Sequence, residues 1–442
     1  MKMSHPGARP NQKVVIVAGA GFAGLSAAKK LARQKELYVV VVDQRNHHLF
    51  QPLLYQVATA GLDPADISVP IRGLFNGYEN VAVHLGNILS VDLDKKTVNF
   101  IDDFRLEYDY LILACGASHS YFGKPQWEEF APGLKTLEQA TEIRRRTLLA
   151  FERAENELDP EKQRALLNFV IIGGGPTGVE LAGAISDISR TVLVRDFRRI
   201  NPVSAKVYLL QSGPRILATF SEKLSKRATA DLTKMGVEVR THSRVDQIDE
   251  SGVRVGGEFI PSRTVLWAAG VQAPELSRTL GVEIDKAGRI KVGPDLSIPQ
   301  HPKVFVIGDF AHFDLSDKKI LPGLAPAAIQ TGVRAAENII ADLHGKERKT
   351  FHYFDKGQMA TIGKRKAVCE VKKFRMAGYP AWLAWAFVHI LYMVGHASRI
   401  LVFTKWIWSY VFSERGSRLI LNENWRSPQK SQEKPQGDQK AA

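Results

Sequence analysis

The sequence contains only two cysteines, Cys115 and Cys369, among 442 residues. Two distant thiols cannot build a disulfide framework, a four-thiolate zinc or iron–sulfur site, or a C-x-x-C redox pair. The chain also has no uninterrupted apolar run of about 20 residues, the length that spans a bilayer. Its N-terminus lacks the apolar core of a signal peptide. These absences predict a protein of a reducing compartment that holds no metal.

Negative charge is in deficit, with 46 Asp and Glu against 60 Lys and Arg, so the net charge is +14. A basic balance favours polyanionic partners, which include nucleic acid, anionic lipid and dinucleotides. Charge alone does not choose among them. The composition, 45% hydrophobic and 24% charged, is that of a globular protein. The length allows two or three domains.

A glycine-rich turn stands between two valine-rich runs near the N-terminus. Residues 14–17 are typical of a strand buried in a parallel sheet. Gly19, Gly21 and Gly24 follow with the spacing G-x-G-x-x-G, and helix formers come next. The second valine run ends at Asp43, where a carboxylate can accept hydrogen bonds from ribose hydroxyls. Together these features predict a dinucleotide site with its phosphates at a helix N-terminus.

The same pattern recurs at residues 169–172, followed by Gly173, Gly175 and Gly178. Two such sites in one chain imply two dinucleotides, an electron donor and an acceptor. The next strand ends at Gln211 instead of an acid. An acid there would repel the 2′-phosphate of NADPH, so Gln211 predicts weak discrimination, with NADH used and NADPH tolerated. A surface glutamine without a role is the alternative.

Three further segments carry candidate site residues. Gln51 and Pro52, in an irregular aromatic stretch, either border a flat cofactor ring or belong to a loop packed over the sheet. Glu180, in the first turn of the second glycine-rich helix, is either favoured by the helix dipole or is a desolvated acid that shuttles a proton. Asp309 follows a third strand and can bind the ribityl hydroxyls of FAD.

Other elements are expected from pattern alone. Residues 80–115 predict a small β meander ending in a strand that returns to the first domain, and Cys115 is expected to be a small buried side chain. Residues 137–158 predict a charged helix, and residues 321–332 predict the start of another.

The C-terminal part is rich in tryptophan. Residues 381–394 are apolar, residues 395–399 interrupt them, and residues 400–412 resume the pattern with Lys405 inside it. This pattern favours two short helices lying at a membrane interface, with their indole rings at headgroup depth. A single span over residues 382–403, and a hairpin buried in the protein or in a homodimer contact, are the alternatives.

Taken together, these motifs resemble the type II NADH dehydrogenases, which are single-subunit, non-pumping NADH:quinone oxidoreductases. The resemblance extends from about Val14 to Trp425. It is carried by the two glycine turns, residues 48–58, residues 306–309, residues 359–368 and the tryptophan-rich end.

The resemblance implies an α/β fold with two Rossmann-like dinucleotide-binding domains, for FAD and NAD(P)H, and a C-terminal amphipathic helical membrane-association segment. The expected divisions are a disordered N-terminus (1–12), the FAD-binding domain (13–165 and 291–375), the NAD(P)H-binding domain (166–290), the membrane-anchoring helices (376–426) and a disordered tail (427–442). The implied partners are a quinone and a lipid surface, with no nucleic acid, and a homodimer is left open. The implied location is peripheral, on the cytoplasmic face of a bacterial membrane, with the mitochondrial inner membrane as the alternative.

The resemblance also assigns residues. Those for FAD are Gly19, Gly21, Phe22, Ala23, Gly24, Asp43, Gln44, Pro52, Ala114, Gly116, Gly308, Asp309 and Ala325. Those for the nicotinamide cofactor are Gly173, Gly175, Pro176, Thr177, Gly178, Gln211, Ala269 and Gly270.

Glu180 and Gln330 are the implied catalytic residues. Pro326 and Thr331 depart from the amides of the family's quinone segment, and Gln211 departs from its usual glutamate.

Three rival functions make different demands on the sequence. A sulfide:quinone or disulfide-type flavoprotein needs paired cysteines that this chain lacks. A soluble ferredoxin reductase has no use for the tryptophan-rich end. A basic nucleic-acid-binding flavoprotein such as apoptosis-inducing factor would bind duplex DNA in a salt-dependent way.

Overall fold

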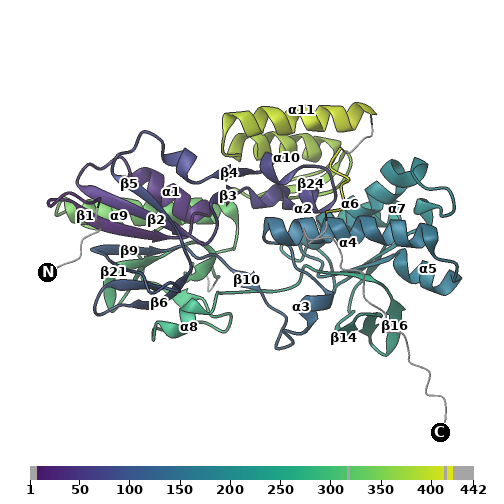
Figure 1. Ribbon diagram of the computed structural model, residues 1–442, viewed down its shortest axis with the longest axis horizontal. Helices are drawn as coiled ribbons and strands as arrows, with labels where there is room; N and C mark the ends of the chain where they lie inside the picture. Colours follow the sequence, from purple (N-terminus) through teal and green to yellow (C-terminus); the bar gives the residue numbers. More distant parts are fainter. Residues whose placement is uncertain (1–6, 316–318, 413–415, 422–442) are drawn as a thin grey trace, which may run out of the picture.

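The computed structural model describes residues 7–315, 319–412 and 416–421 (Figure 1). The predicted disordered tail (427–442) and residues 1–6 of the predicted disordered N-terminus (1–12) lie outside these ranges, so their expected disorder stays a prediction. The fold is mixed α/β, as predicted, with two parallel sheets that each contain one of the glycine turns.

The first sheet has six strands in the order β20-β21-β9-β1-β2-β5, and β20 alone is antiparallel. Its strands are β1 (Lys13–Ala18), β2 (Leu37–Asp43), β5 (Val81–Leu85), β9 (Tyr110–Leu113), β20 (Ser297–Ile298) and β21 (His301–Val306). β1 and β2 are buried along nearly their whole length, because both faces of the sheet are covered. Helices α1 (Phe22–Leu31) and α9 (Ala325–Leu343) pack on one face, and a second hydrophobic cluster that includes Val98 and Phe100 packs on the other. This explains their valine runs without polar alternation.

The second sheet repeats this arrangement with four parallel strands in the order β13-β12-β11-β17. They are β11 (Asn168–Ile172), β12 (Lys206–Leu210), β13 (Val237–Arg240) and β17 (Thr264–Trp267). The helices beside them are α6 (Pro176–Asp187) and α7 (Glu222–Lys234). α4 (Leu137–Asn156) corresponds to the charged helix predicted over residues 137–158. Its N-cap is Thr136, whose hydroxyl accepts a hydrogen bond from the Gln139 N–H.

The sequence predicted one β meander over residues 80–115, but the structure divides this segment between two sheets. β5 joins the edge of the parallel sheet, and only β6 (Ile88–Asp92), β7 (Thr97–Phe100) and β8 (Arg105–Glu107) make an antiparallel unit. β5 pairs with β2 because the segment following β2 crosses over, which is a long-range event that no local pattern indicates. The strand that returns to the first sheet, β9, is confirmed.

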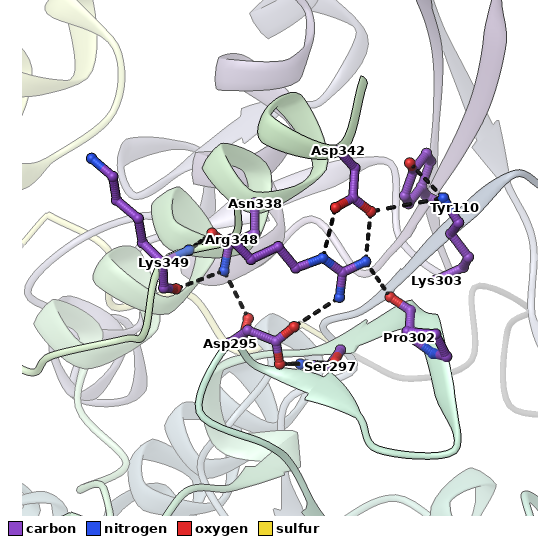
Figure 2. A network of polar contacts seen from close by, with 9 residues as sticks. All are labelled: Tyr110, Asp295, Ser297, Pro302, Lys303, Asn338, Asp342, Arg348 and Lys349. Atoms are coloured by element: carbon purple, nitrogen blue, oxygen red, sulfur yellow. Dashed lines mark hydrogen bonds and ion pairs between the residues drawn. The ribbon is translucent and has the colours of Figure 1, made fainter. Parts of the chain in front are cut away.

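One polar network fixes the orientation of α9 (Figure 2). The guanidinium of Arg348 donates to both carboxylate oxygens of Asp342, at 2.8 and 2.6 Å, and to Asp295 Oδ2 at 2.7 Å. Asn338 of α9 donates to the backbone carbonyl of Asp295. These bonds tie the C-terminal end of α9 to the loop before β20. The middle of the same helix packs against the start of α1, where a Cβ on Gly332 would lie 2.2 Å from the Ala23 carbonyl oxygen.

A three-stranded antiparallel sheet precedes the C-terminal helices. It consists of β23 (Gln358–Gly363), β24 (Lys366–Val371) and β25 (Phe374–Gly378). A Cβ on Gly183 would lie 1.7 Å from the carbonyl oxygen of Ile362, so only glycine lets β23 come this close to α6. The domain boundaries given above stay a prediction.

Two short helices follow, α10 (Tyr379–Tyr392) and α11 (His396–Phe412), as the sequence predicted. They lie side by side along one edge of the molecule, at the top of Figure 1. The break is shorter than expected, because Arg399 belongs to α11 and donates from Nε to the Met393 carbonyl oxygen at 2.7 Å. Within the described part of the chain, no helix combines the length and hydropathy needed to cross a membrane.

The tryptophans of these helices do not all face outward, contrary to the prediction of rings at headgroup depth. Trp385 is 1% exposed and Trp406 is 9% exposed, and their ring centroids are 5.4 Å apart inside the protein. Trp408 is the exposed member, at 56%. The inner indoles fill the space between the helix pair and α2 (Leu54–Ala58), where smaller side chains would leave a cavity.

Candidate active site

The first glycine turn is closely packed at two glycines and open at the third. Gly19 has φ +106°, and a Cβ on it would lie 2.3 Å from the Ala114 carbonyl oxygen. A Cβ on Gly24 would lie 1.8 Å from the Gly19 carbonyl oxygen, whereas nothing lies within 4 Å of a Cβ built on Gly21. The open position is at the N-terminus of α1, where a pyrophosphate fits.

Asp43 closes this turn from the end of β2. Its Oδ2 accepts a hydrogen bond from the Ala20 N–H at 2.7 Å, and its Oδ1 accepts one from the Arg45 N–H at 2.8 Å. The carboxylate is therefore fixed beside the phosphate position. An acid so placed suits the ribose of a bound dinucleotide.

Asp309 lies at the end of β21, after Gly308, whose φ is +65°. The Gly308 N–H donates to the Thr331 hydroxyl of α9 at 3.1 Å, so Thr331 is a structural residue here. Burial raises the pKa of Asp309, and the charge of Lys135 lowers it in part. Lys135 has a pKa lowered by burial and partly restored by Asp309. It is a cation of this site that no sequence motif indicated.

The second glycine turn repeats the geometry of the first. A Cβ on Gly173 would lie 2.5 Å from the Ala268 carbonyl oxygen, and one on Gly178 would lie 1.8 Å from the Gly173 carbonyl oxygen. Nothing lies within 4 Å of a Cβ on Gly175. This second open position, at the N-terminus of α6, fits a second pyrophosphate.

Gln211 occupies in the second turn the place that Asp43 has in the first. Its Oε1 accepts a hydrogen bond from the Gly174 N–H at 2.8 Å. The side chain therefore lies in the crevice and is partly buried, rather than on an unrelated surface. A neutral amide makes the same hydrogen bond that a carboxylate would make, but without its charge.

Glu180 lies on α6, half a turn beyond Gly178, and faces β23. Burial raises the pKa of Glu180 to about 8, and the Thr361 N–H offsets part of this shift by donating a hydrogen bond. At neutral pH the carboxyl group is therefore mostly protonated. The close packing at Gly183, described above, brings Thr361 to this position.

Glu180 lines a pocket formed by four separate segments. They are α2, α6, the β23 region and the α10–α11 pair, and the lining includes Tyr55, Gln56, Thr361, Trp382, Trp385 and Trp406. Gln56 accepts a hydrogen bond from the Trp406 Nε1–H at 2.8 Å and donates one to the Tyr55 hydroxyl at 2.9 Å. The pocket thus joins the 48–58 motif, the second glycine helix and the tryptophan-rich end.

Gln330 lies on α9 and contacts the backbone of Phe354. Its Nε2 donates to the Phe354 carbonyl oxygen at 3.0 Å, and its Oε1 accepts from the Phe354 N–H at 2.9 Å. Both ends of the amide are engaged, so the side chain fixes the course of residues 351–357.

The remaining predicted residues lie at the ends of the expected elements. Those near the first turn are Gln44 after β2, Pro52 in the short helix Gln51–Leu53, Gly116 after β9, and Phe22, Ala23 and Ala325 at helix N-termini. Those near the second turn are Pro176 and Thr177 at the start of α6, and Ala269 and Gly270 after β17.

Comparison with known proteins agrees with this geometry. A family model described as pyridine nucleotide-disulphide oxidoreductase matches residues 12–332. The type II NADH:quinone oxidoreductase Ndh of Mycobacterium tuberculosis is 40% identical over 94% of this chain and 91% of its own length. NdhA of the same organism, with the same description, is also 40% identical, over 96% and 92% of the two chains.

Solved structures show the same fold at lower identity. NDH2 of Plasmodium falciparum, in a complex with NADH, superposes with a TM-score of 0.84 at 19% identity, covering 93% of this chain and all of that one. The sulfide:quinone oxidoreductase of Aquifex aeolicus gives a TM-score of 0.71 at 20% identity, covering 90% and 95%. On the family model and the identity to relatives over nearly the whole length, the chain belongs to the pyridine nucleotide-disulphide oxidoreductase family and, within it, to the type II NADH:quinone oxidoreductases.

Proposed function

We propose that this protein oxidises NADH and reduces a quinone, with FAD as the intermediate electron carrier. The observation that carries the proposal is the 40% identity to proteins named type II NADH:quinone oxidoreductases over more than nine-tenths of both chains. Two matching glycine turns support it, because the reaction needs two dinucleotides in one chain.

The first turn is the proposed FAD site. Gly21 receives the pyrophosphate, Asp43 the ribose, and Asp309 the ribityl chain, with Lys135 supplying a positive charge nearby. The other proposed FAD contacts are Gly19, Phe22, Ala23, Gly24, Gln44, Pro52, Ala114, Gly116, Gly308 and Ala325.

The second turn is the proposed NADH site. Gly175 receives the pyrophosphate and Gln211 the adenosine ribose. The other proposed contacts are Gly173, Pro176, Thr177, Gly178, Ala269 and Gly270.

When bound, FAD accepts a hydride from NADH and gives two electrons to the quinone. Reduction of a quinone to a quinol takes up two electrons and two protons; the hydride of NADH accounts for the two electrons and one proton, so one further proton must be supplied. Glu180 is the proposed proton donor, because a carboxyl group with a pKa of about 8 carries a proton at neutral pH. Gln330 is the proposed positioning residue, which holds the Phe354 segment near the N-terminal part of α9.

The quinone is proposed to arrive from a membrane on which the protein lies. The outer faces of α10 and α11 carry exposed apolar side chains at helical spacing, which are Tyr379, Leu383, Phe387, Leu391, Ile400, Phe403 and Ile407. We name this set the apolar stripe. Such a face suits a helix pair lying in an interface. The proposed location is the cytoplasmic face of a bacterial membrane.

Anaerobic absorbance of the purified holoenzyme tests the reaction. NADH should bleach the flavin band, and a soluble short-chain quinone should restore it. Glu180→Gln should slow the recovery about a hundredfold while leaving the bleaching step nearly unchanged. Absence of bleaching contradicts NADH as donor, and bleaching without recovery contradicts the quinone as acceptor.

A further inference from the structure

Half of the net charge of the chain is concentrated near the apolar stripe. Residues 351–412 contain nine Lys and Arg but only two Asp and Glu, a net charge of +7 out of +14 for the whole chain. The two acids are engaged locally. Asp355 accepts from the Gly357 N–H, and Glu370 accepts from Arg375 and from the Ser221 N–H. Arg375 is paired with Glu370 and Lys405 with Asp63 and Asp66, whereas Lys356, Lys372 and Lys373 form no ion pair among the described residues.

The tip of the β24–β25 hairpin concentrates this charge beside an exposed aromatic ring. Val371 pairs with Phe374, so Lys372 and Lys373 form the turn, and Lys372 has φ +54°. Lys372, Lys373 and Phe374 are all exposed, Phe374 at 59%. A tight turn directs these side chains away from the sheet.

Two lysine–aromatic pairs connect the tip to the end of α10. Lys372 Nζ lies 5.5 Å from the ring centroid of Phe354, which is 61% exposed. Lys356, two residues further on, donates to the Tyr392 hydroxyl at 2.7 Å and lies 5.2 Å from that ring. Tyr392 ends α10 next to Leu391 of the apolar stripe. Cations and exposed rings thus form a border at this end of the stripe.

We propose that Lys356, Lys372 and Lys373 form a binding site for the headgroups of anionic phospholipids, beside an apolar stripe that contacts the acyl region. This inference rests on the proposed membrane association and adds the class of lipid. A lysine near an anionic surface strengthens binding about fivefold, and exposed aromatic rings suit the interface between headgroups and chains. The charge complements an anionic surface and has no counterpart in a zwitterionic one.

Vesicle sedimentation of the holoenzyme tests the proposal. The probes are vesicles of phosphatidylcholine alone and of phosphatidylcholine mixed with phosphatidylglycerol. The protein should bind the mixed vesicles more tightly, and added salt should reduce this preference. Lys372→Gln with Lys373→Gln should lower binding to the mixed vesicles about twentyfold and leave binding to phosphatidylcholine unchanged.

A matched control lies in the turn between β6 and β7. Lys95 and Lys96 also form an exposed lysine pair, and Lys96 has the same φ of +54°. Lys95→Gln with Lys96→Gln removes equal charge far from α10 and should leave the lipid preference intact. Both double variants should keep their flavin absorbance and their activity with a soluble quinone, which shows that they are folded.

Four results would overturn the lipid assignment. Equal binding of the unmodified protein to both kinds of vesicle contradicts a headgroup site but leaves membrane association standing. Equal losses in the two double variants indicate an effect of overall charge. Tight, salt-dependent binding to duplex DNA that displaces the vesicles identifies nucleic acid as the partner. Failure to bind either vesicle contradicts the membrane association itself, and the headgroup site with it.

Discussion

Lys405 of α11 places its ammonium 2.7 Å from the carboxylate of Asp66, a residue more than 300 positions earlier that is 2% exposed. Asp63 accepts a second bond from the same ammonium at 2.9 Å. In the sequence, Lys405 is a charged residue inside an apolar segment. Here it points inward and fastens the C-terminal helix pair to the segment after α2.

Replacing this lysine should therefore destabilise the protein. Lys405→Met leaves the buried carboxylate of Asp66 without its cation, which costs about 2 kcal/mol after allowance for the partial exposure of Lys405. The midpoint of chemical denaturation of the holoenzyme measures this loss. Lys226→Met, which removes an exposed i,i+4 ion pair with Glu222, is the control and should change stability by less than about 0.5 kcal/mol. Equal effects of the two substitutions would show that the inward pair has no special role.

Gly175 and Gly178 of the second turn should respond differently to alanine. Gly178→Ala brings a methyl group to 1.8 Å from a backbone oxygen, so the β11–α6 packing must open and the protein should lose stability. Gly175→Ala meets no protein atom within 4 Å, so the protein should fold normally, while the methyl group should raise the KM for NADH at least tenfold. Thermal denaturation and steady-state kinetics separate the two effects. An unchanged KM in Gly175→Ala would show that the pyrophosphate does not approach this glycine.

The fold was predictable where its signals are local. All the signals of the first dinucleotide site fall within 30 residues: the strand Val14 to Val17, the spaced glycines and the terminal acid Asp43. The strand and glycines of the second site, at residues 169–178, are equally local. The placement of β5 at the edge of the first sheet was not predictable, and neither was the packing of β23 on α6. The latter depends on Gly183 meeting the carbonyl of Ile362, a contact between residues far apart in the sequence.

Gln211→Glu should make the enzyme selective for NADH. The glutamate can keep the hydrogen bond from the Gly174 N–H, so the turn should be preserved, while its charge repels the 2′-phosphate of NADPH. The kcat/KM for NADPH should fall more than tenfold, with that for NADH changed less than about threefold. If NADPH use is unchanged, Gln211 does not face the adenosine ribose.

Glu180 should make stability depend on pH in a defined direction. The pKa of its carboxyl group is near 4.5 in the unfolded chain and is raised to about 8 in the folded protein. Between these values the unfolded chain has released a proton that the folded chain keeps, so the free energy of unfolding decreases as pH rises. Above about pH 8 this contribution is constant.

Glu180→Gln removes this titration. Denaturation midpoints of the holoenzyme between about pH 5 and pH 8 should fall less steeply in this variant than in the unmodified protein. Glu161→Gln, at an exposed position in the first turn of α5 (Pro160–Leu166), should retain the original slope. Parallel slopes in all three proteins would mean that Glu180 is ionised at neutral pH, and the proton-donor role would then be lost.

The site was less predictable than the fold, for a physical reason. In the sequence, Glu180 fits equally well as a helix N-terminal charge or as a desolvated acid. The choice depends on β23 and on the indoles of α10 and α11, which line the pocket around it. Lys135 and the inward direction of Lys405 had no local signal either, because their carboxylate partners are supplied by distant segments.

The residues that line the Glu180 pocket decide how the enzyme should be prepared. Trp382 and Trp385 of α10 and Trp406 and Ser409 of α11 belong to them, so the helices with the apolar stripe also complete the pocket around Glu180. Deleting α10 and α11 to obtain an enzyme that needs no detergent would open this pocket to water. The pKa of Glu180 would then fall toward its ordinary value. Preparations for inhibitor screening should therefore keep these helices and rely on micelles or nanodiscs.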